Sequence, residues 1–227
     1  MTELFDSYRS NYQDVVQSSI DFSGLPHSFF MRAKADLLRE LIARRLGPAM
    51  PAMLDVGCGV GSLHPLLRGM VGRLSGIDVS SDCITQARIN NPDVDYPDFD
   101  GGSLPFDDAS FDLVTAICMM HHVPPADWTY LMSEMRRVVR PGGLICVIEH
   151  NPLNPLTRLA VSRCEFDSDA ALLGAGKARK LMAAGGLRQI GARYFLLLPW
   201  ETKPARLLEN ALSNVPFGAQ YAAFGTV

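Results

Sequence analysis

A glycine-rich turn behind a short apolar run constrains the fold of this chain more than any other feature. The segment reads MLDVGCGVGS from Met53 to Ser62, with glycines at positions 57, 59 and 61. An apolar run followed by spaced glycines is typical of a parallel strand that turns directly into a helix. The bare backbone and the helix N-terminus then lie at the carboxyl edge of a sheet, where open α/β folds bind ligands. We therefore expect a ligand beside Gly57, Gly59 and Gly61.

Short apolar runs alternate with segments of helical period along the rest of the chain, a pattern typical of βα units in a mostly parallel sheet. Segments 28–46 and 128–139 carry apolar residues at helical spacing, and proline and glycine follow each of them. With 227 residues, the chain has room for one α/β domain. The predicted strands, of which the third is weak, are 52–56, 72–77, 94–97, 111–117, 144–149, 189–198 and 219–226.

Composition argues against several classes of function. The net charge of −3 does not provide the clustered cations that a nucleic-acid groove needs. The five cysteines are scattered without a CxxC pair and are odd in number, so neither a disulfide framework nor a zinc site is indicated. No signal-peptide pattern opens the chain, and no apolar run approaches the roughly 20 residues that span a bilayer. We expect a soluble, cytoplasmic protein with no nucleic-acid or membrane partner.

Two carboxylates extend the glycine motif toward an adenosine pocket. Asp78 ends the second predicted strand, where a carboxylate can accept both hydroxyls of a ribose. Asp100, in DGGSLPFDDASFD, is placed to accept from an exocyclic amine such as that of adenine. The dinucleotide fingerprint requires a third glycine where this chain has Ser62, so the spacing fits GxGxG better than GxGxxG. Each Asp also suits a helix cap or turn, and the glycines also suit a tight turn without ligand.

Five segments in order resemble one enzyme family: MLDVGCGVGS, GIDVS, DGGSLPFDDASFDLV, MMHHV and RRVVRPGGLICVIE. They look like the class I S-adenosylmethionine-dependent methyltransferases, in the type 11 small-molecule branch, over residues 50–150. The resemblance implies a Rossmann-like three-layer sandwich. Its seven-stranded, mostly parallel sheet would have the order 3-2-1-4-5-7-6 and an antiparallel last strand. It further implies a single domain over 1–227, with an N-terminal lid and helix (1–46), a cofactor-binding core (47–150), and an acceptor-binding loop with a C-terminal hairpin (151–227).

The same resemblance assigns S-adenosyl-L-methionine as the cofactor, and residue by residue it implies a binding site. The glycine loop would meet the methionine moiety, Asp78 the ribose, and Asp100 with Gly101 the adenine. Tyr8 and Tyr12 of the lid segment would close over the cofactor. The complete implied set is Asp55, Gly57, Gly59, Gly61, Asp78, Val79, Asp100, Gly101, Ile117, Cys118 and Tyr12.

The methyl acceptor would lie beside the loops that follow the fourth and fifth predicted strands. His122 and His150 are the candidates for a general base, because an unperturbed imidazole titrates near neutral pH. Asn151 and Arg158, and also Arg163, are candidates for holding the acceptor; ordinary loop polarity explains them equally well. His121 and His122 are adjacent, and adjacent residues do not easily present both side chains to one point. No HExxH motif or third ligand accompanies them, so we expect no metal.

These features predict methyl transfer to a small molecule, such as a sugar, a nucleotide-linked sugar or a secondary metabolite. An NAD(P)-dependent Rossmann oxidoreductase is the alternative enzyme, disfavoured by Ser62 and by the absence of a Tyr-x-x-x-Lys motif. A non-catalytic S-adenosylmethionine-binding partner protein is the alternative outside enzymes. The helical N-terminus and an exposed final strand would support a homodimer.

Overall fold

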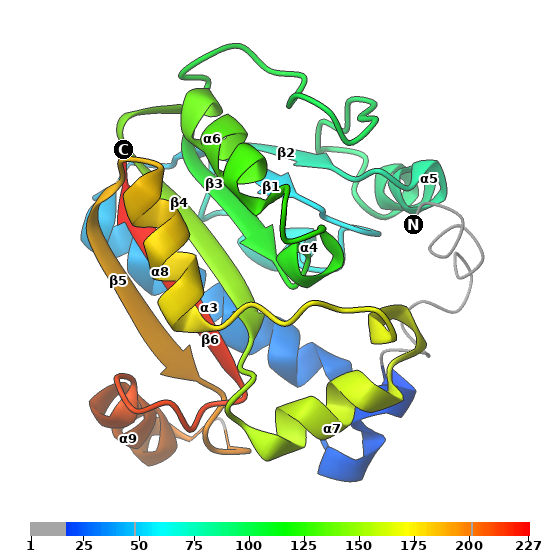
Figure 1. Cartoon of the computed structure of the whole chain (residues 1–227), viewed down its shortest axis with the longest axis vertical. Helices are drawn as coiled ribbons and strands as arrows, with labels where there is room; N and C mark the ends of the chain where they lie inside the picture. Colours follow the sequence, from blue (N-terminus) through cyan, green and yellow to red (C-terminus); the bar gives the residue numbers. More distant parts are fainter. Residues whose placement is uncertain (1–16, 48, 201) are drawn as a thin grey trace.

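A six-stranded sheet forms the centre of the protein (Figure 1). The computed structural model describes residues 17–47, 49–200 and 202–227, so Tyr8 and Tyr12 of the expected lid lie outside the described residues. The sheet order is β2-β1-β3-β4-β6-β5. Its strands are β1 (Ala52–Val56), β2 (Arg73–Ile77), β3 (Phe111–Ile117), β4 (Val139–His150), β5 (Arg188–Phe195) and β6 (Gln220–Thr226).

The weak strand expected at 94–97 does not form, and the prediction of seven strands is wrong. Only Asp95 pairs with β2, in an isolated parallel bridge to Ser75. Two features stop this pairing from extending. Pro97 has no N–H to donate, and the Tyr96 carbonyl accepts instead from the Arg88 guanidinium. The other six strands keep the expected relative order.

The final strand β6 runs antiparallel to both of its neighbours, β4 and β5. The expected antiparallel last strand is therefore present. Its expected exposure is wrong, because β6 lies inside the sheet and its residues are almost all buried. The strands at the two edges are β2 and β5. The sequence argument for a homodimer through an exposed final strand loses its basis.

Helices cover both faces of the sheet, as expected for a three-layer sandwich. On one face, α6 (Trp128–Val138) and α8 (Ala175–Ala184) pack against Val114 and Val147; on the other, α3 (His27–Arg45) packs against Leu113. Alternate residues of each buried strand thus enter opposite layers, as the pleat requires. Figure 1 shows α6 and α8 in front of the sheet and α3 behind it.

Shorter elements gather at the carboxyl ends of the parallel strands and prepare the site there. The 3-10 helix η2 (Met120–His122) follows β3, and α7 (Pro155–Arg163) follows β4 after an Asn154 cap. In the described part of the chain, no helix combines the length and apolarity needed to cross a membrane. The remaining helices are η1 (Asp21–Ser23), α4 (His64–Leu67), α5 (Ser81–Asn90), η3 (Glu165–Asp167) and α9 (Lys203–Leu212).

Candidate functional site

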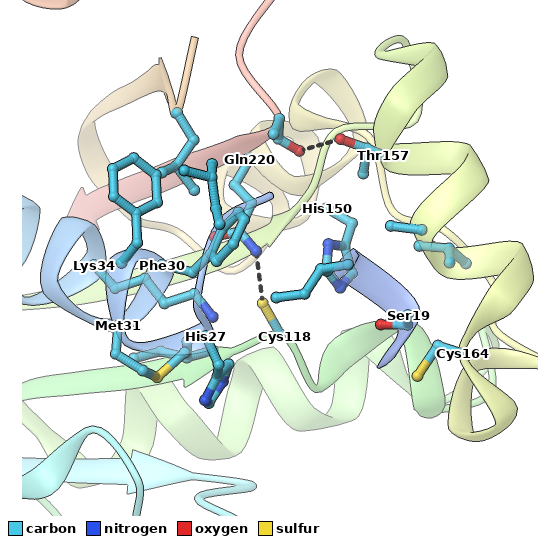
Figure 2. A pocket seen from close by; sticks show the side chains of 18 of the residues that line it. Ser19, His27, Phe30, Met31, Lys34, Cys118, His150, Thr157, Cys164 and Gln220 are labelled. Carbon is cyan, nitrogen blue, oxygen red and sulfur yellow. Dashed lines mark hydrogen bonds between the residues drawn. The ribbon is translucent and has the colours of Figure 1, made fainter. Parts of the chain in front are cut away.

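A cavity of about 560 Å³ opens at the carboxyl ends of β1 and β3 (Figure 2). The glycine loop forms one wall, and α3, η2, α7 and the start of β6 form the others. This volume lies within the range of small-molecule sites. Of the residues predicted for the site, the cavity is lined by Asp55, Gly57, Gly59, Ile117, Cys118, His122 and His150.

The glycine loop has a backbone that side chains would not permit. Gly57, Gly59 and Gly61 have φ of 70°, 54° and 69°, in the left-handed region that favours glycine. A Cβ on Gly57 would lie 2.7 Å from the Cβ of Met119. The loop is fixed by Asp78, whose carboxylate accepts from the backbone N–H of Gly59 at 2.8 Å and of Ser80 at 3.0 Å. Burial raises the pKa of Asp78, and these two backbone donors oppose that rise.

A buried chain of polar side chains supports the same loop from below. The Asp55 carboxylate accepts from Thr115 Oγ1 at 2.7 Å and lies 3.2 Å from His64 Nε2. His64 Nδ1 lies 2.6 Å from the Tyr96 hydroxyl. A Cβ on Gly61 would stand 2.7 Å from that hydroxyl, so these groups pack directly against the loop. The sequence analysis missed His64 and Tyr96, because nothing local links them to Asp55.

The residues predicted for ribose and adenine lie on a rim beside the cavity. Asp78, Val79, Asp100 and Gly101 are not among the described residues that line it. Val79 and Gly101 are neighbours, since a Cβ on Gly101 would lie 3.4 Å from Val79 Cγ1. Asp100 is exposed and accepts from the Gly102 N–H at 2.9 Å. The structure thus brings the loop, Val79 and Gly101 to one edge of the sheet and leaves the Asp100 carboxylate open to solvent.

Cys118 lies in the wall where β3 ends. Its φ of 51° is unusual for a residue with a side chain, and its N–H donates to the Ile148 carbonyl at 2.8 Å. Gln220 donates to the sulfur at 3.5 Å, as Figure 2 shows. Burial raises the pKa of the Cys118 thiol, and the nearby Lys34 ammonium opposes this rise. The thiol is therefore protonated near neutral pH and acts as a wall of the cavity.

Lys34 is a functional candidate that the sequence analysis missed. It is 5% exposed on α3, and of the described Lys and Arg residues it alone lines the cavity. Two other lining groups, Ser62 Oγ and Gln220 Oε1, are buried without a hydrogen-bond partner. Buried polar atoms are normally paired, so this wall is suited to a polar ligand. The helical period of α3 predicted a core face, on which a lysine gave no separate signal.

Three of the histidines that line the cavity gather around two acidic residues. His121 Nδ1 lies 2.6 Å from Glu149 Oε2, and His121 Nε2 lies 3.3 Å from Asp167 Oδ1. His122 Nε2 lies 3.4 Å from the same Asp167 oxygen. The ring centres of His121 and His150 are 5.2 Å apart. The predicted pair of His122 and His150 is thus joined by three residues that the sequence analysis did not assign.

The acidic neighbours give these imidazoles different protonation states. Burial works to lower the pKa of His121, but Glu149 and Asp167 together hold it well above its usual value. Burial, followed by the charge on His121, lowers the pKa of both His122 and His150 to about 4. Near neutral pH, His122 and His150 are therefore neutral and can accept hydrogen bonds.

The other predicted acceptor residues do not enter the cavity. The Asn151 amide donates to the carbonyls of Pro216 and Gly218, at 3.0 and 2.8 Å, and so ties the end of β4 to the segment before β6. Arg158 is exposed on α7, and Arg163 lies over the ring of Phe22. None of the three lines the cavity as the described residues define it.

Comparison with known proteins gives consistent matches. The model of a methyltransferase-domain family matches residues 54–147. The ubiquinone biosynthesis O-methyltransferase of Xanthomonas axonopodis pv. citri is 31% identical over 132 residues, which cover 56% of this chain and 54% of that protein. The 2-methyl-6-phytyl-1,4-hydroquinone methyltransferase of Synechocystis is 32% identical over 143 residues, covering 61% of this chain and 41% of that protein. The chain spans about half the length of the curated relatives that it matches.

A solved structure extends the similarity in fold to the whole chain. An S-adenosylmethionine-dependent methyltransferase of Thermotoga maritima superimposes with a TM-score of 0.67 at 19% identity. The superposition covers 100% of this chain and 99% of that one. At this identity the similarity concerns the fold.

Proposed function

Residues 54–147 belong to the class I S-adenosylmethionine-dependent methyltransferases of type 11, and on that premise we propose that this chain methylates a small, largely apolar acceptor. The observation that carries the proposal is the continuity of one cavity from the glycine loop to the histidine cluster. A cofactor held by the loop and an acceptor held at the cluster would share that space.

The residues of the loop side suit S-adenosylmethionine. Its reactive group is a methyl on a positively charged sulfur. We propose that Asp78 accepts the ribose hydroxyls, while Val79, Asp100 and Gly101 border the adenine. The unpaired Ser62 Oγ and the buried Lys34 ammonium support a ligand with an amino-acid tail. In this arrangement, Lys34 pairs with the carboxylate of that tail.

The apolar part of the cavity lining suits an apolar ring. It includes Phe22, Phe30, Val161, Leu197 and Leu198. A sugar would need several hydrogen-bond partners that these side chains lack. Among the expected acceptor classes, this lining favours a secondary metabolite, and a hydroquinone of the kind named for one relative has the same character.

Positioning and desolvation are the catalytic contributions that this chain can make. The apolar walls exclude water, and the loop and cluster hold two ligands in one cavity, which favours an in-line approach. Neutral imidazoles at His122 and His150 can accept a hydrogen bond from an acceptor hydroxyl. We therefore propose these two residues as the hydrogen-bonding groups on the acceptor side.

Calorimetry and labelled methyl transfer test this proposal together. The protein is titrated with S-adenosylhomocysteine and, separately, with NAD, and is then assayed with labelled S-adenosylmethionine against hydroquinones, phenols and sugars. We expect binding of S-adenosylhomocysteine alone and transfer to an aromatic hydroxyl. Binding of NAD alone would favour the oxidoreductase alternative. Binding of S-adenosylhomocysteine with no transfer to any acceptor would favour a non-catalytic partner protein.

A further inference from the structure

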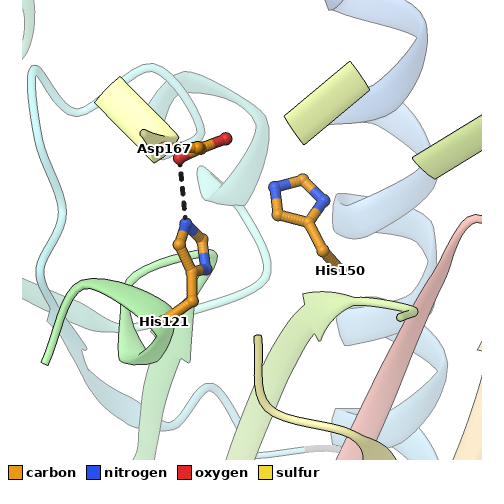
Figure 3. Close-up of side chains that lie close together, drawn as sticks. All are labelled: His121, His150 and Asp167. Carbon is orange, nitrogen blue, oxygen red and sulfur yellow. Dashed lines mark hydrogen bonds and ion pairs between the residues drawn. The ribbon is translucent and has the colours of Figure 1, made fainter. Parts of the chain in front are cut away.

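His121, His150 and Asp167 converge on one space at the edge of the cavity (Figure 3). They come from three separate elements, namely η2, the end of β4, and η3. One nitrogen or oxygen from each side chain lies within 4.8 Å of those of the other two. All three residues line the cavity, so the point between them is open to a ligand inside it.

The separations of these atoms are compatible with a bound ion as well as with the hydrogen bond that joins two of them. His121 Nε2 is 3.3 Å from Asp167 Oδ1, whereas a charge-assisted hydrogen bond is typically about 2.8 Å. Two ligands that are each about 2.1 Å from a tetrahedral zinc ion lie about 3.4 Å apart. The third ligand atom, on His150, lies within 4.8 Å of the other two, so it would have to approach by up to about 1.4 Å to reach the tetrahedral separation.

Glu149 provides a second, independent observation. Its side chain is fully buried and lies 2.6 Å from His121 Nδ1, the nitrogen opposite the convergent one. Its other oxygen accepts from the Met120 N–H at 2.8 Å. Metal-bound histidines almost always donate their second nitrogen to a carboxylate or carbonyl in this way, which fixes the tautomer and the direction of the ring. Glu149 therefore directs Nε2 of His121 at Asp167 and His150.

We propose that His121, His150 and Asp167 form a binding site for a divalent transition-metal ion, with Glu149 as the residue that orients His121. Two imidazoles and one carboxylate suit zinc or iron(II) and leave at least one coordination position free. That position faces the cavity. The expectation of no metal rested on the adjacent pair His121 and His122 and on the lack of a third ligand, whereas the fold brings Asp167 to His121 from 46 positions away.

The role of the ion rests on the proposed function. An acceptor hydroxyl bound at the free position loses its proton to solvent more readily, because the ion stabilises the oxygen anion. A lone pair of the acceptor oxygen then forms the bond to the methyl carbon. At the same time the carbon–sulfur bond breaks, and its electrons return to sulfur. In this arrangement His150 acts as a ligand, and His122 remains available to hydrogen-bond the acceptor.

Cobalt(II) titration of the untagged, chelator-treated full chain tests the site without reference to activity. We expect one equivalent of Co²⁺ to bind, with the visible absorption of a four- or five-coordinate site. His150→Gln and Asp167→Asn should each weaken binding at least tenfold, and Glu149→Gln by about 10- to 100-fold. His27→Gln is the matched control, since His27 lines the same cavity on α3 outside the cluster, and it should bind cobalt as the wild type does.

If a variant of the histidine cluster fails to fold, thermal unfolding of the wild type provides a second test of metal binding. Zinc added to the chelator-treated wild type and to His27→Gln should raise the Tm of both, because an ion that binds only the folded state stabilises it. No cobalt spectrum and no zinc-dependent Tm shift in the wild type would overturn the proposal, as would unchanged binding in folded His150→Gln and Asp167→Asn. Calorimetry with S-adenosylhomocysteine, run on the same samples, reports separately on the proposed function.

Discussion

The glycine-loop wall of the cavity comes from one short stretch of chain, whereas the histidine wall comes from three distant ones. Residues 53–62 supply the strand end and the turn, and Asp78 follows on the neighbouring strand. Across the cavity, His121, His150 and Asp167 meet only because β3 and β4 are paired and η3 folds back over them. The first wall is built by local backbone geometry, and the second by tertiary contacts.

This difference separates the shared chemistry of the site from its specificity. The loop depends on a strand end and three glycines that lie within one short stretch of chain. A wall assembled from distant side chains can change one residue at a time, and residues on loops and connections are where specificity usually lies. Variants of the two walls should therefore affect different ligands.

The largest effect is expected from Asp78→Ala on the loop side. If the carboxylate accepts both ribose hydroxyls as proposed, its removal should reduce S-adenosylhomocysteine affinity by about 100-fold, roughly 3 kcal/mol. The loss of its hydrogen bonds from Gly59 and Ser80 would act in the same direction. Calorimetry measures this loss, with circular dichroism to confirm the fold. Asp78→Asn, which keeps the shape and one acceptor oxygen, should lose less. Unchanged affinity in folded Asp78→Ala would show that the ribose assignment is wrong.

Lys34→Met should have the next largest effect. It should weaken the binding only of ligands that carry the amino-acid tail. If the ammonium pairs with the ligand's carboxylate, affinity for S-adenosylhomocysteine should fall about thirtyfold, near 2 kcal/mol. Methylthioadenosine, which lacks the amino-acid tail, should bind the variant and the wild type equally. Lys177→Met, at an exposed position of α8, is the control. A loss of acceptor binding alone would place Lys34 on the histidine wall.

Glu134→Gln should weaken the loop that follows Asp100. Glu134 accepts from the Leu104 N–H at 2.8 Å and from the Arg137 guanidinium, which lowers its pKa below the ordinary 4.5. A lowered carboxyl pKa stabilises the fold above the ordinary value, and that stabilisation is lost as the pH falls below it. At neutral pH, the free energy of unfolding of the variant should be about 1.5 kcal/mol lower than that of the wild type. Urea titrations should show that the difference in unfolding free energy between the wild type and Glu134→Gln becomes smaller below pH 4.5.

Tyr96→Phe should destabilise the protein by about 1 kcal/mol, because it leaves His64 Nδ1 without its hydroxyl partner at 2.6 Å. Urea denaturation measures this change. Cofactor affinity should drop only slightly, since the hydroxyl supports the glycine loop and does not line the cavity. If the free energy of cofactor binding falls by more than the free energy of unfolding, the hydrogen-bonded side chains of Asp55, His64 and Tyr96 control the loop directly.

Arg158→Ala should have the smallest effect. The sequence predicted a role in holding the acceptor, but the side chain is exposed on α7 and outside the cavity lining. We expect the acceptor KM to change less than about twofold, as for an ordinary surface substitution. A selective rise in the acceptor KM would return Arg158 to the acceptor site and would require α7 to move.

Much of the fold and the conformation of the glycine loop could be predicted from sequence. Strands 52–56 and 111–117 form with the predicted bounds, because each is a short apolar run bounded by turn residues. The strand at 94–97 could not be excluded in this way, since its failure depends on Arg88 and Pro97 acting on one particular neighbour. Lys34 and Asp167 were missed because neither belongs to a local motif.

The sequence by itself determined the strand, the glycine turn and the carboxylate at Asp78, because backbone conformation and short spacing depend on neighbouring residues. Only the tertiary structure decided that His121 faces Glu149 on one side and Asp167 on the other. It also decided that Lys34 lines the cavity. Those contacts depend on the pairing of β4 with β3 and on the positions of η3 and α3, which come from distant parts of the chain.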